Sequence, residues 1–237
     1  MKMRRLIAGL ILIIVISLLM GCIDGRPPEY SVGNPYAILD KTGGVIVAYQ
    51  VNTGNEAKTY IQRFSANGDW GKQGIELGAG SGSFTSSLID FASLVTDKYG
   101  NVTVIYSLGD NVWARKLDMA GNPVWEGETT KRISPTDLPT PAYFKAIGND
   151  ADETIIAWSG SRDHLTIMKG DGFNTSYVTS VSTPNLDKFD LASDASGNVY
   201  VSWKDNPNYS EGNIYVQKVD SNGQVAWQSE GILLSDV

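Results

Sequence analysis

The stretch DKTGGVIVAY at residues 40–49 decides the fold, because the same pattern returns three more times without gaps. The other copies are DKYGNVTVIY at 97–106, NDADETIIAW at 149–158 and DASGNVYVSW at 194–203. Their leading residues are 57, 52 and 45 positions apart, and each copy ends on an aromatic residue. A spacing of this size indicates a repeat architecture in which each unit is a small supersecondary structure.

Each copy has the residue pattern of a β-hairpin. The leading Asp or Asn accepts hydrogen bonds from the backbone ahead of it, and a glycine three residues later suits the end of a type I turn. The β-branched residues that follow favour a half-buried, pleated strand. The third copy has Asp152 in place of the glycine. We expect its turn to form nevertheless, because Asp tolerates a left-handed backbone better than most residues.

A second motif follows three of the copies. It is an expected strand and turn with the sequences YIQRFSANG at 60–68, WARKLDMAG at 113–121 and YVQKVDSNG at 215–223. A tryptophan comes next in each case, and the three are Trp70, Trp125 and Trp227. In the first and last copies a glycine and a short apolar strand follow the tryptophan. In the third copy the motif is degraded, and we expect residues 165–168 to be its third strand.

The pattern therefore predicts four short antiparallel strands in each unit. No helical pattern of useful length follows Cys22. The sequence predicts an all-β domain at 35–237, an array of about four four-stranded sheets with units at 35–78, 87–135, 142–182 and 188–235. The D-x-x-G-N turns and W-x-x-x-G segments resemble those of bacterial surface proteins of the β-propeller family. This resemblance implies a propeller-like fold and little about function, since propellers host unrelated activities.

The first 21 residues have the pattern of a secretory signal peptide. Three of the first five residues are cationic, and residues 6–20 carry no charge. The sequence LMGC at 19–22 resembles the bacterial lipobox. That resemblance implies cleavage after Gly21 and transfer of a lipid, with fatty acids such as palmitate, to Cys22. Residues 22–34 are then expected to be the lipidated cysteine and a short tether.

A protein with this N-terminus is expected outside the cytoplasm, anchored to a cell membrane by its lipid. Removal of residues 1–21 takes three cations away and changes the formal net charge from −7 to −10. The net field of such a domain does not attract nucleic acid or anionic lipid. Membrane attachment is therefore expected to depend on the lipid at Cys22. This is the only cysteine, so no disulfide forms within the chain.

The sequence singles out no catalytic residue, cofactor site or metal ligand. His164 is the only histidine, and we expect it to be a solvated turn residue. Arg63 and Arg115 lie on equivalent expected strands but are offset by one position, which places them on opposite faces and does not favour the arginine clamp of sialidases. Five aspartates precede turns, where capping of the backbone explains them better than metal binding; they are Asp40, Asp97, Asp118, Asp194 and Asp220.

The aromatic residues are the remaining functional signal. The four that end the repeated stretch are expected to pack between adjacent sheets, because large rings dominate burial; they are Tyr49, Tyr106, Trp158 and Trp203. The tryptophans in the turns, Trp70, Trp125 and Trp227, are the better candidates for binding a ligand.

We expect a non-catalytic binding or interaction module for a protein or a glycan. The alternative is a propeller enzyme that acts on polysaccharide, a glycoside hydrolase or lyase. The repeats begin and end in phase, so the first and last units must cover each other or pair with another chain. A closed monomer is favoured here, and a dimer that shares these faces is the alternative.

Overall fold

The computed structural model describes most of the chain beyond residue 30. The described segments are residues 31–52, 56–66, 68–71, 74–81, 91–108, 111–125, 130–133, 143–170, 175–206 and 212–235. Residues Val32–Val237 form one compact unit, distinct from Met1–Ser31. The expected signal peptide and the lipidation site Cys22 lie outside the described residues. Among the described residues, no helix is long and apolar enough to cross a membrane.

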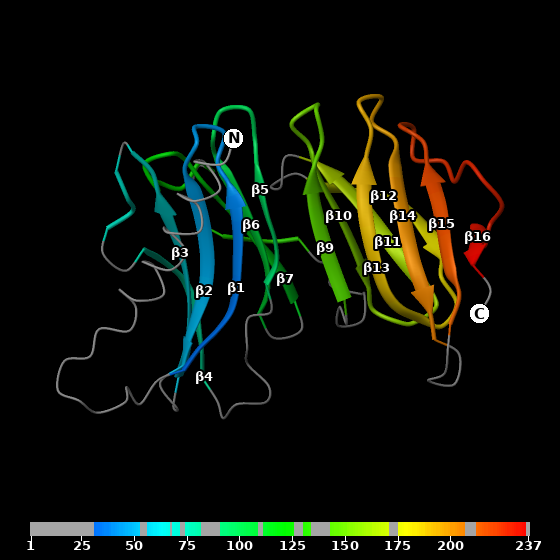
Figure 1. The fold of residues 1–237 in the computed structure, drawn as a ribbon, viewed down its shortest axis with the longest axis horizontal. Coiled ribbons are helices and arrows are strands. Elements are labelled where there is room, and N and C mark those ends of the chain that lie inside the picture. The colour runs from blue at the N-terminus through cyan, green and yellow to red at the C-terminus, as the bar shows by residue number, and fades with distance from the viewer. Residues whose placement is uncertain are drawn as a thin grey trace, which may run out of the picture. The chain divides into compact units, whose positions relative to one another are not determined.

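Sixteen strands within the described segments form four sheets of four strands each (Figure 1). The first sheet contains β1 (Ser31–Leu39), β2 (Val45–Asn52), β3 (Glu56–Phe64) and β4 (Ile75–Ser81). The second contains β5 (Phe91–Thr96), β6 (Val102–Leu108), β7 (Asn111–Leu117) and β8 (Lys131–Arg132). The third contains β9 (Tyr143–Gly148), β10 (Thr154–Ser159), β11 (His164–Gly170) and β12 (Thr175–Ser182). The fourth contains β13 (Leu186–Ser193), β14 (Val199–Asp205), β15 (Ile214–Val219) and β16 (Ile232–Ser235).

Neighbouring strands in each sheet are consecutive in the sequence, and the strand pairs are antiparallel. The expected all-β, propeller-like array of four four-stranded sheets is therefore confirmed. The structure also includes the expected third strand of the degraded third unit, as β11. The first sheet begins earlier than residue 35, because the end of the expected tether already belongs to β1.

The turns between the first and second strands form as the repeated stretch predicts. In the first sheet Asp40 Oδ1 accepts hydrogen bonds from the backbone amides of Thr42 at 2.8 Å and Gly44 at 2.6 Å. The same pair of bonds to residues two and four positions ahead recurs in the other three sheets. Asp152, which replaces the glycine in the third turn, has a φ of 60°, so the expected left-handed conformation is confirmed.

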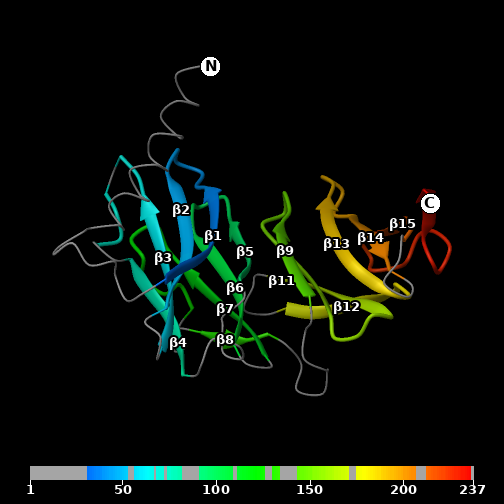
Figure 2. The ribbon, with the colours of Figure 1, turned by 60° about the horizontal axis from the view of Figure 1, so that its bottom comes forward.

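The four sheets follow one another in chain order (Figure 2). The hydrophobic core lies between them, in three clusters that each join consecutive sheets. One face of β2 meets the second sheet, as Ile46 and Ala48 contact Val104 and Tyr106 in the first cluster. In the second and third sheets, the second strand contacts the preceding sheet with one face and the following sheet with the other. The aromatic residues that end the repeated stretch are buried, with exposed fractions of 7%, 1%, 2% and 2% for Tyr49, Tyr106, Trp158 and Trp203. The last three belong to clusters between sheets, as expected, whereas Tyr49 stacks on Tyr60 of its own sheet at 5.7 Å and belongs to none of these clusters.

Candidate functional site

The first strands of three sheets line an open groove of about 340 Å³. Tyr36 and Ile38 of β1, Leu94 of β5 and Lys145 of β9 contribute to its wall, and Lys41 lies at its rim on the first turn. A volume of this size falls within the range of small-ligand sites. The groove therefore lies where the first strands of three sheets come together.

The groove combines an aromatic ring with charged and amide groups. Tyr36 is 37% exposed, and Lys41 is also exposed. Lys145 forms an ion pair with Asp190 of β13, which joins the third and fourth sheets. The hydrogen bond from Lys145 lowers the pKa of the Asp190 carboxyl below its usual range. The groove thus offers a stacking surface and cationic hydrogen-bond donors to a polar ligand.

The aspartates that precede turns cap the backbone, as the sequence predicts. Asp118 and Asp220 lie in the turns that follow the third strands, and each Oδ1 accepts from the amides two and four positions ahead. Asp97 and Asp194 do the same in the first turns, and each also accepts a bond from an asparagine side chain at 2.8 Å. Within the part of the chain that the structure describes, no three His, Cys, Asp or Glu side chains gather as metal ligands do.

Asp40 additionally forms a buried ion pair within the first sheet, and its partner Arg63 also contacts the second sheet. Arg63 of β3 donates from Nε to Asp40 Oδ2 at 2.8 Å, and their side chains are 5% and 0% exposed. Arg63 Nη1 also donates to the carbonyl oxygen of Met119, in the second sheet, at 2.8 Å. Arg115 reaches into the same interface from the other side and donates to the Glu76 carbonyl at 2.9 Å. The two arginines lie on opposite faces of their own sheets, as expected, and both hold the first and second sheets together.

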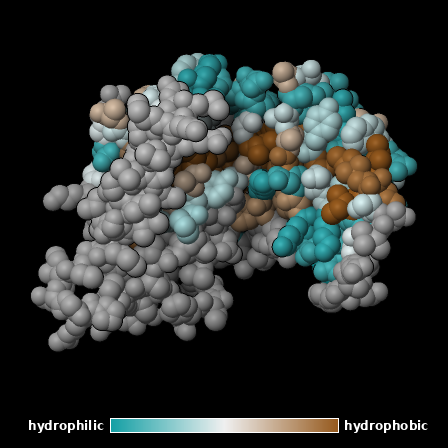
Figure 3. All heavy atoms as spheres, viewed as in Figure 1, coloured by the Kyte–Doolittle hydropathy of each residue, from teal (hydrophilic) through white to brown (hydrophobic). Residues whose placement is uncertain are grey.

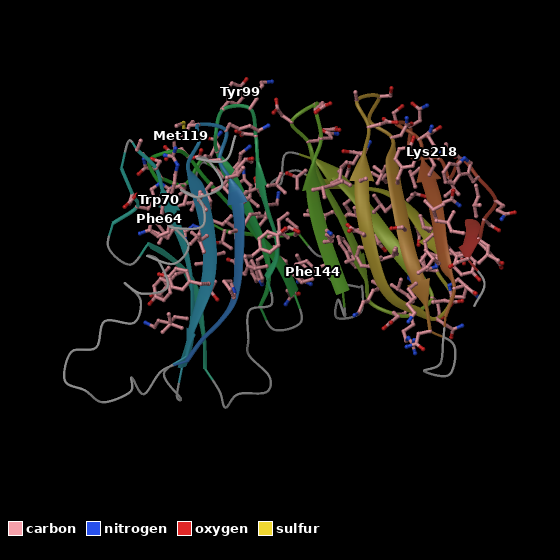
Figure 4. The ribbon with its side chains drawn as sticks, viewed as in Figure 1. Phe64, Trp70, Tyr99, Met119, Phe144 and Lys218 are labelled. Carbon is pink, nitrogen blue, oxygen red and sulfur yellow. The ribbon has the colours of Figure 1, made fainter. Side chains whose placement is uncertain are left out.

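The three tryptophans singled out from the sequence have different surroundings. Trp70 is only 8% exposed, and its Nε1 donates to the Met119 carbonyl at 3.0 Å, so it is an inter-sheet residue (Figure 4). Trp125 is half-buried and packs against the cluster between the second and third sheets. Trp227 is 36% exposed, and its ring lies 6.2 Å from that of Tyr200. Among these candidates, Trp227 is therefore the most accessible to a partner.

His164 begins β11 and is exposed, in agreement with the expectation of a solvated residue. Its Nδ1 lies 3.4 Å from the Ser161 hydroxyl. This histidine therefore has a local contact with a turn, and among the described residues no carboxylate is found in contact with it that would orient it as a general base.

The groove residues were not among the candidates from the sequence, although a signal was present. Tyr36, Ser93, Lys145 and Asp190 each lie four residues before the residue that leads the turn. When the four units are aligned on their turns, these residues occupy one repeat position, which holds a different side chain in each unit. Of these four residues, Tyr36 and Lys145 line the groove and Asp190 pairs with Lys145, whereas Ser93 is buried.

No family model matches the chain, and no curated protein is detectably similar to it in sequence. Similar solved structures include a protein of unknown function from Dyadobacter fermentans, with 11% identity over 85% of this chain and 66% of that one, at a TM-score of 0.49. They also include the Aleuria aurantia lectin with α-methyl-L-fucoside (14% identity, 80% and 57% covered, TM-score 0.45). A third is the GH43 endo-arabinanase from Bacillus licheniformis (13%, 81% and 76%, TM-score 0.43). The chain spans just under two thirds of the Dyadobacter protein, and none of these likenesses assigns an activity to it.

Proposed function

We propose that the protein is a membrane-anchored, extracytoplasmic lipoprotein whose array of sheets is a non-catalytic module that binds a glycan in the groove along β1, β5 and β9. The observation that carries this proposal is the chemistry of the groove. Tyr36 offers a ring on which a sugar can stack, and Lys41 and Lys145 offer hydrogen bonds to hydroxyl or carboxylate oxygens. Few convergent polar groups around an apolar wall are typical of small-molecule sites.

The engagement of the carboxylates supports binding over catalysis. A glycoside hydrolase of the usual kind needs two carboxylic acids that flank the scissile bond. In the described sheets the turn aspartates accept backbone amides, and Asp190 is paired with Lys145. Asp150, which also lines the groove, has no second carboxylate among the lining residues. A polysaccharide-cleaving activity thus has less support than a glycan-binding one.

The lipid anchor rests on the N-terminal sequence. Cys22→Ser removes the thiol that would carry the lipid, and we expect the variant to lose both its fatty-acid label and its retention in the membrane fraction. Metabolic labelling of cells that express the full chain with a radioactive fatty acid measures this directly. Equal label on the wild type and the variant would exclude Cys22 as the site of lipidation.

The ligand proposal is tested by a glycan screen with the full chain in detergent. We expect Tyr36→Ala to weaken binding of a hit about fivefold or more, because the loss of an aromatic contact costs about 1 kcal/mol or more. Tyr99→Ala is the matched control, since Tyr99 is 69% exposed and lies outside the groove. Equal loss in both variants contradicts the groove as the site, and release of sugar from the hit would favour the polysaccharide-cleaving enzyme instead.

A further inference from the structure

The second sheet departs from the repeat at one position of its third strand. Strand pairing places Gln62 of β3, Arg115 of β7 and Gln217 of β15 opposite equivalent valines of the second strands. Each glutamine accepts the backbone amide of the residue that follows it, and its Nε2 donates at 2.6 Å to the carbonyl of the residue after the tryptophan. An arginine side chain has no acceptor and cannot make this pair of bonds. The second sheet therefore has a cation where its counterparts have a neutral amide.

Arg115 is half-buried between the first and second sheets, and no described carboxylate is paired with it. Its Nη1 donates to the backbone carbonyl of Glu76 in β4 at 2.9 Å, whereas the Glu76 carboxylate lies 3.6 Å from Lys58 Nζ. Burial lowers the pKa of Arg115, and no carboxylate among the described residues opposes that shift. A guanidinium stays protonated in proteins, and burying a charge is costly unless the charge is paired. This interface therefore contains a positive charge that the described residues do not neutralise.

Two buried N–H groups of β7 have no acceptor. They are Nε of Arg115 and Nε1 of Trp113. Nε and Nη2 form one edge of the Arg115 guanidinium, and the bond to Glu76 uses Nη1 on the other edge. Trp113 lies two residues before Arg115, and the two side chains share a face because the side-chain period of a strand is two. Buried polar groups are nearly always hydrogen-bonded, so two orphaned donors on one face indicate an acceptor that the chain itself does not supply.

The neighbouring strands add a second cation and an aromatic ring to this face. Arg132 of β8 is paired with Trp113 on one side, and Tyr106 of β6 is paired with it on the other. Cross-strand partners point to one face, with Cβ atoms about 4.5–5.5 Å apart. Burial raises the pKa of the Tyr106 hydroxyl, and a hydrogen bond with Thr130 and the nearby charge of Arg115 partly offset this rise. The face therefore combines two guanidinium groups, an indole N–H and a phenol ring.

We propose that this face of the second sheet binds the carboxylate group of a ligand, with the Nε–Nη2 edge of Arg115 and the indole N–H of Trp113 as donors. A guanidinium edge matches the two oxygens of a planar carboxylate with two parallel hydrogen bonds, and the carboxylate neutralises the buried charge. The carboxylate belongs either to a simple organic acid or to an acidic sugar, and the test below separates the two. The site lies on the third and fourth strands of the second sheet, whereas the groove proposed for a glycan follows the first strands.

The test follows the indole N–H signals of the ¹⁵N-labelled full chain in detergent by NMR. The chain has six tryptophans, and Trp113→Phe identifies the signal of Trp113 by its loss. Sodium acetate and sodium D-glucuronate are the two probes. We expect the Trp113 signal to move and to saturate, because the indole N–H then donates to a charged oxygen. D-glucose, and sodium chloride at matched ionic strength, should leave this signal in place.

Three other tryptophans are controls within the same spectrum. Trp70 Nε1 already donates to a backbone carbonyl at 3.0 Å, so its signal should stay. Trp203 Nε1 is buried without an acceptor, as that of Trp113 is, but its face holds the neutral Gln217. The Trp203 signal should also stay, which separates the effect of the guanidinium from that of an unpaired indole. Trp227 is 36% exposed in the fourth sheet, where Figure 3 shows hydrophobic residues on the surface over β16, and its signal reports non-specific effects of the solution.

Arg115→Gln introduces the residue that the first and fourth sheets have at this position, so we expect this variant to fold. It should bind either anion about tenfold more weakly or worse, because a hydrogen bond to a charged group contributes about a factor of ten or more. Lys188→Gln removes an exposed cation of β13 and is the matched control, with unchanged affinity expected. If Arg115→Gln does not fold, Arg115→Lys takes its place with the same expected loss, because lysine keeps the charge but lacks the two-donor edge.

Each outcome decides the proposal. The absence of a saturating shift of the Trp113 signal with both anions overturns it. An affinity that is unchanged in Arg115→Gln, or that falls equally in Lys188→Gln, also overturns it, because the anion is then not held by Arg115. Similar affinities for acetate and D-glucuronate support the site with a simple carboxylate as its ligand. Binding of D-glucuronate about tenfold tighter than that of acetate supports the site with an acidic sugar as its ligand.

Discussion

The first and fourth sheets contain the same motif in opposite surroundings. In the first sheet Arg63 and Trp70 are buried, and both donate to the carbonyl of Met119 in the next sheet. In the fourth sheet Lys218 and Trp227 occupy the same positions, but Lys218 is only half-buried and Trp227 is 36% exposed. The difference shows that the burial of the motif depends on the sheet that follows it and not on the residues of its own sheet.

This comparison has an energetic consequence for the whole array. The stability of a repeat protein is approximately a sum of unit terms and nearest-neighbour interface terms. A residue of the motif should therefore contribute strongly where a next sheet is present and weakly where it is absent. Paired substitutions at equivalent positions measure this difference, since the local chemistry is similar and the neighbour differs.

The largest expected effect is the loss of Arg63. Arg63→Met leaves the Asp40 carboxylate buried without its cation, which typically costs about 3–5 kcal/mol of the free energy of unfolding. Lys218→Met removes only a surface contact with the Tyr200 ring and should cost less than about 1 kcal/mol. Urea denaturation at pH 7 measures both. Equal losses of stability at the two positions would mean that the following sheet does not determine how much this residue contributes.

A smaller effect is expected at the glycines of the fourth sheet. Gly231 has a φ of 78°, and a Cβ built there would lie 2.5 Å from the Trp203 ring and 2.8 Å from the Val216 carbonyl. Gly197 has a similar φ of 79°, but a Cβ there would meet nothing closer than 3.6 Å. Gly231→Ala should cost about 3 kcal/mol, because a strained backbone and an overpacked contact each contribute about 1–2 kcal/mol.

Gly197→Ala isolates the backbone part of that effect. Its expected cost is about 1 kcal/mol, since a left-handed conformation is strained for alanine and the surrounding space is open. Thermal melts of the two variants beside the parent measure the difference. If both substitutions lower the melting temperature equally, the close approach of Trp203 to Gly231 contributes nothing and the fourth sheet is packed less tightly than its geometry implies.

The repeated stretch was sufficient to predict the sheets and turns because those features depend on local chemistry. The leading aspartate caps the turn through its own nearest backbone amides. Asp152 adopts the positive φ that its turn position requires, and it also binds Lys98 of the second sheet, which the sequence pattern does not show. The opposite faces of Arg63 and Arg115 follow from the two-residue period of a strand. Apart from the contact with Lys98, these features are visible in a single sequence.

The site was harder to predict because it depends on how sheets meet. Trp70 appears in a turn beside polar residues, and only its contact with Met119, in another sheet, makes it buried. Tyr36 and Lys145 are far apart in the chain, and packing of the sheets places them along one groove. Periodicity shows which face of a strand is apolar, but it contains no information on which edges meet.

The smallest expected effect concerns the aspartate that leads the fourth turn, and the aspartate of the first turn is its reference. Burial raises the pKa of Asp40, but the hydrogen bonds from Arg63, Gly44 and Thr42 outweigh it and hold that pKa below its usual range. The pKa of Asp194 is also lowered, chiefly by the hydrogen bond from the Asn198 side chain. A carboxyl whose pKa is lower in the folded state stabilises it fully above about pH 4 and loses this contribution as the pH falls through the folded value.

Asp194→Asn should therefore lower the melting temperature slightly between pH 5 and 7, and the gap to the parent should close as the pH falls from about 4 towards 2. The loss is small because an asparagine oxygen caps the same turn in the third sheet, where Asn149 accepts the amides of Ala151 and Glu153. Asp40→Asn should open a wider gap at pH 7, since it also weakens the bond to buried Arg63. Melting curves at several pH values measure both gaps. A gap for Asp194→Asn that stays constant down to pH 2 would mean that the charge of Asp194 contributes nothing, and that the turn is held by its amide contacts alone.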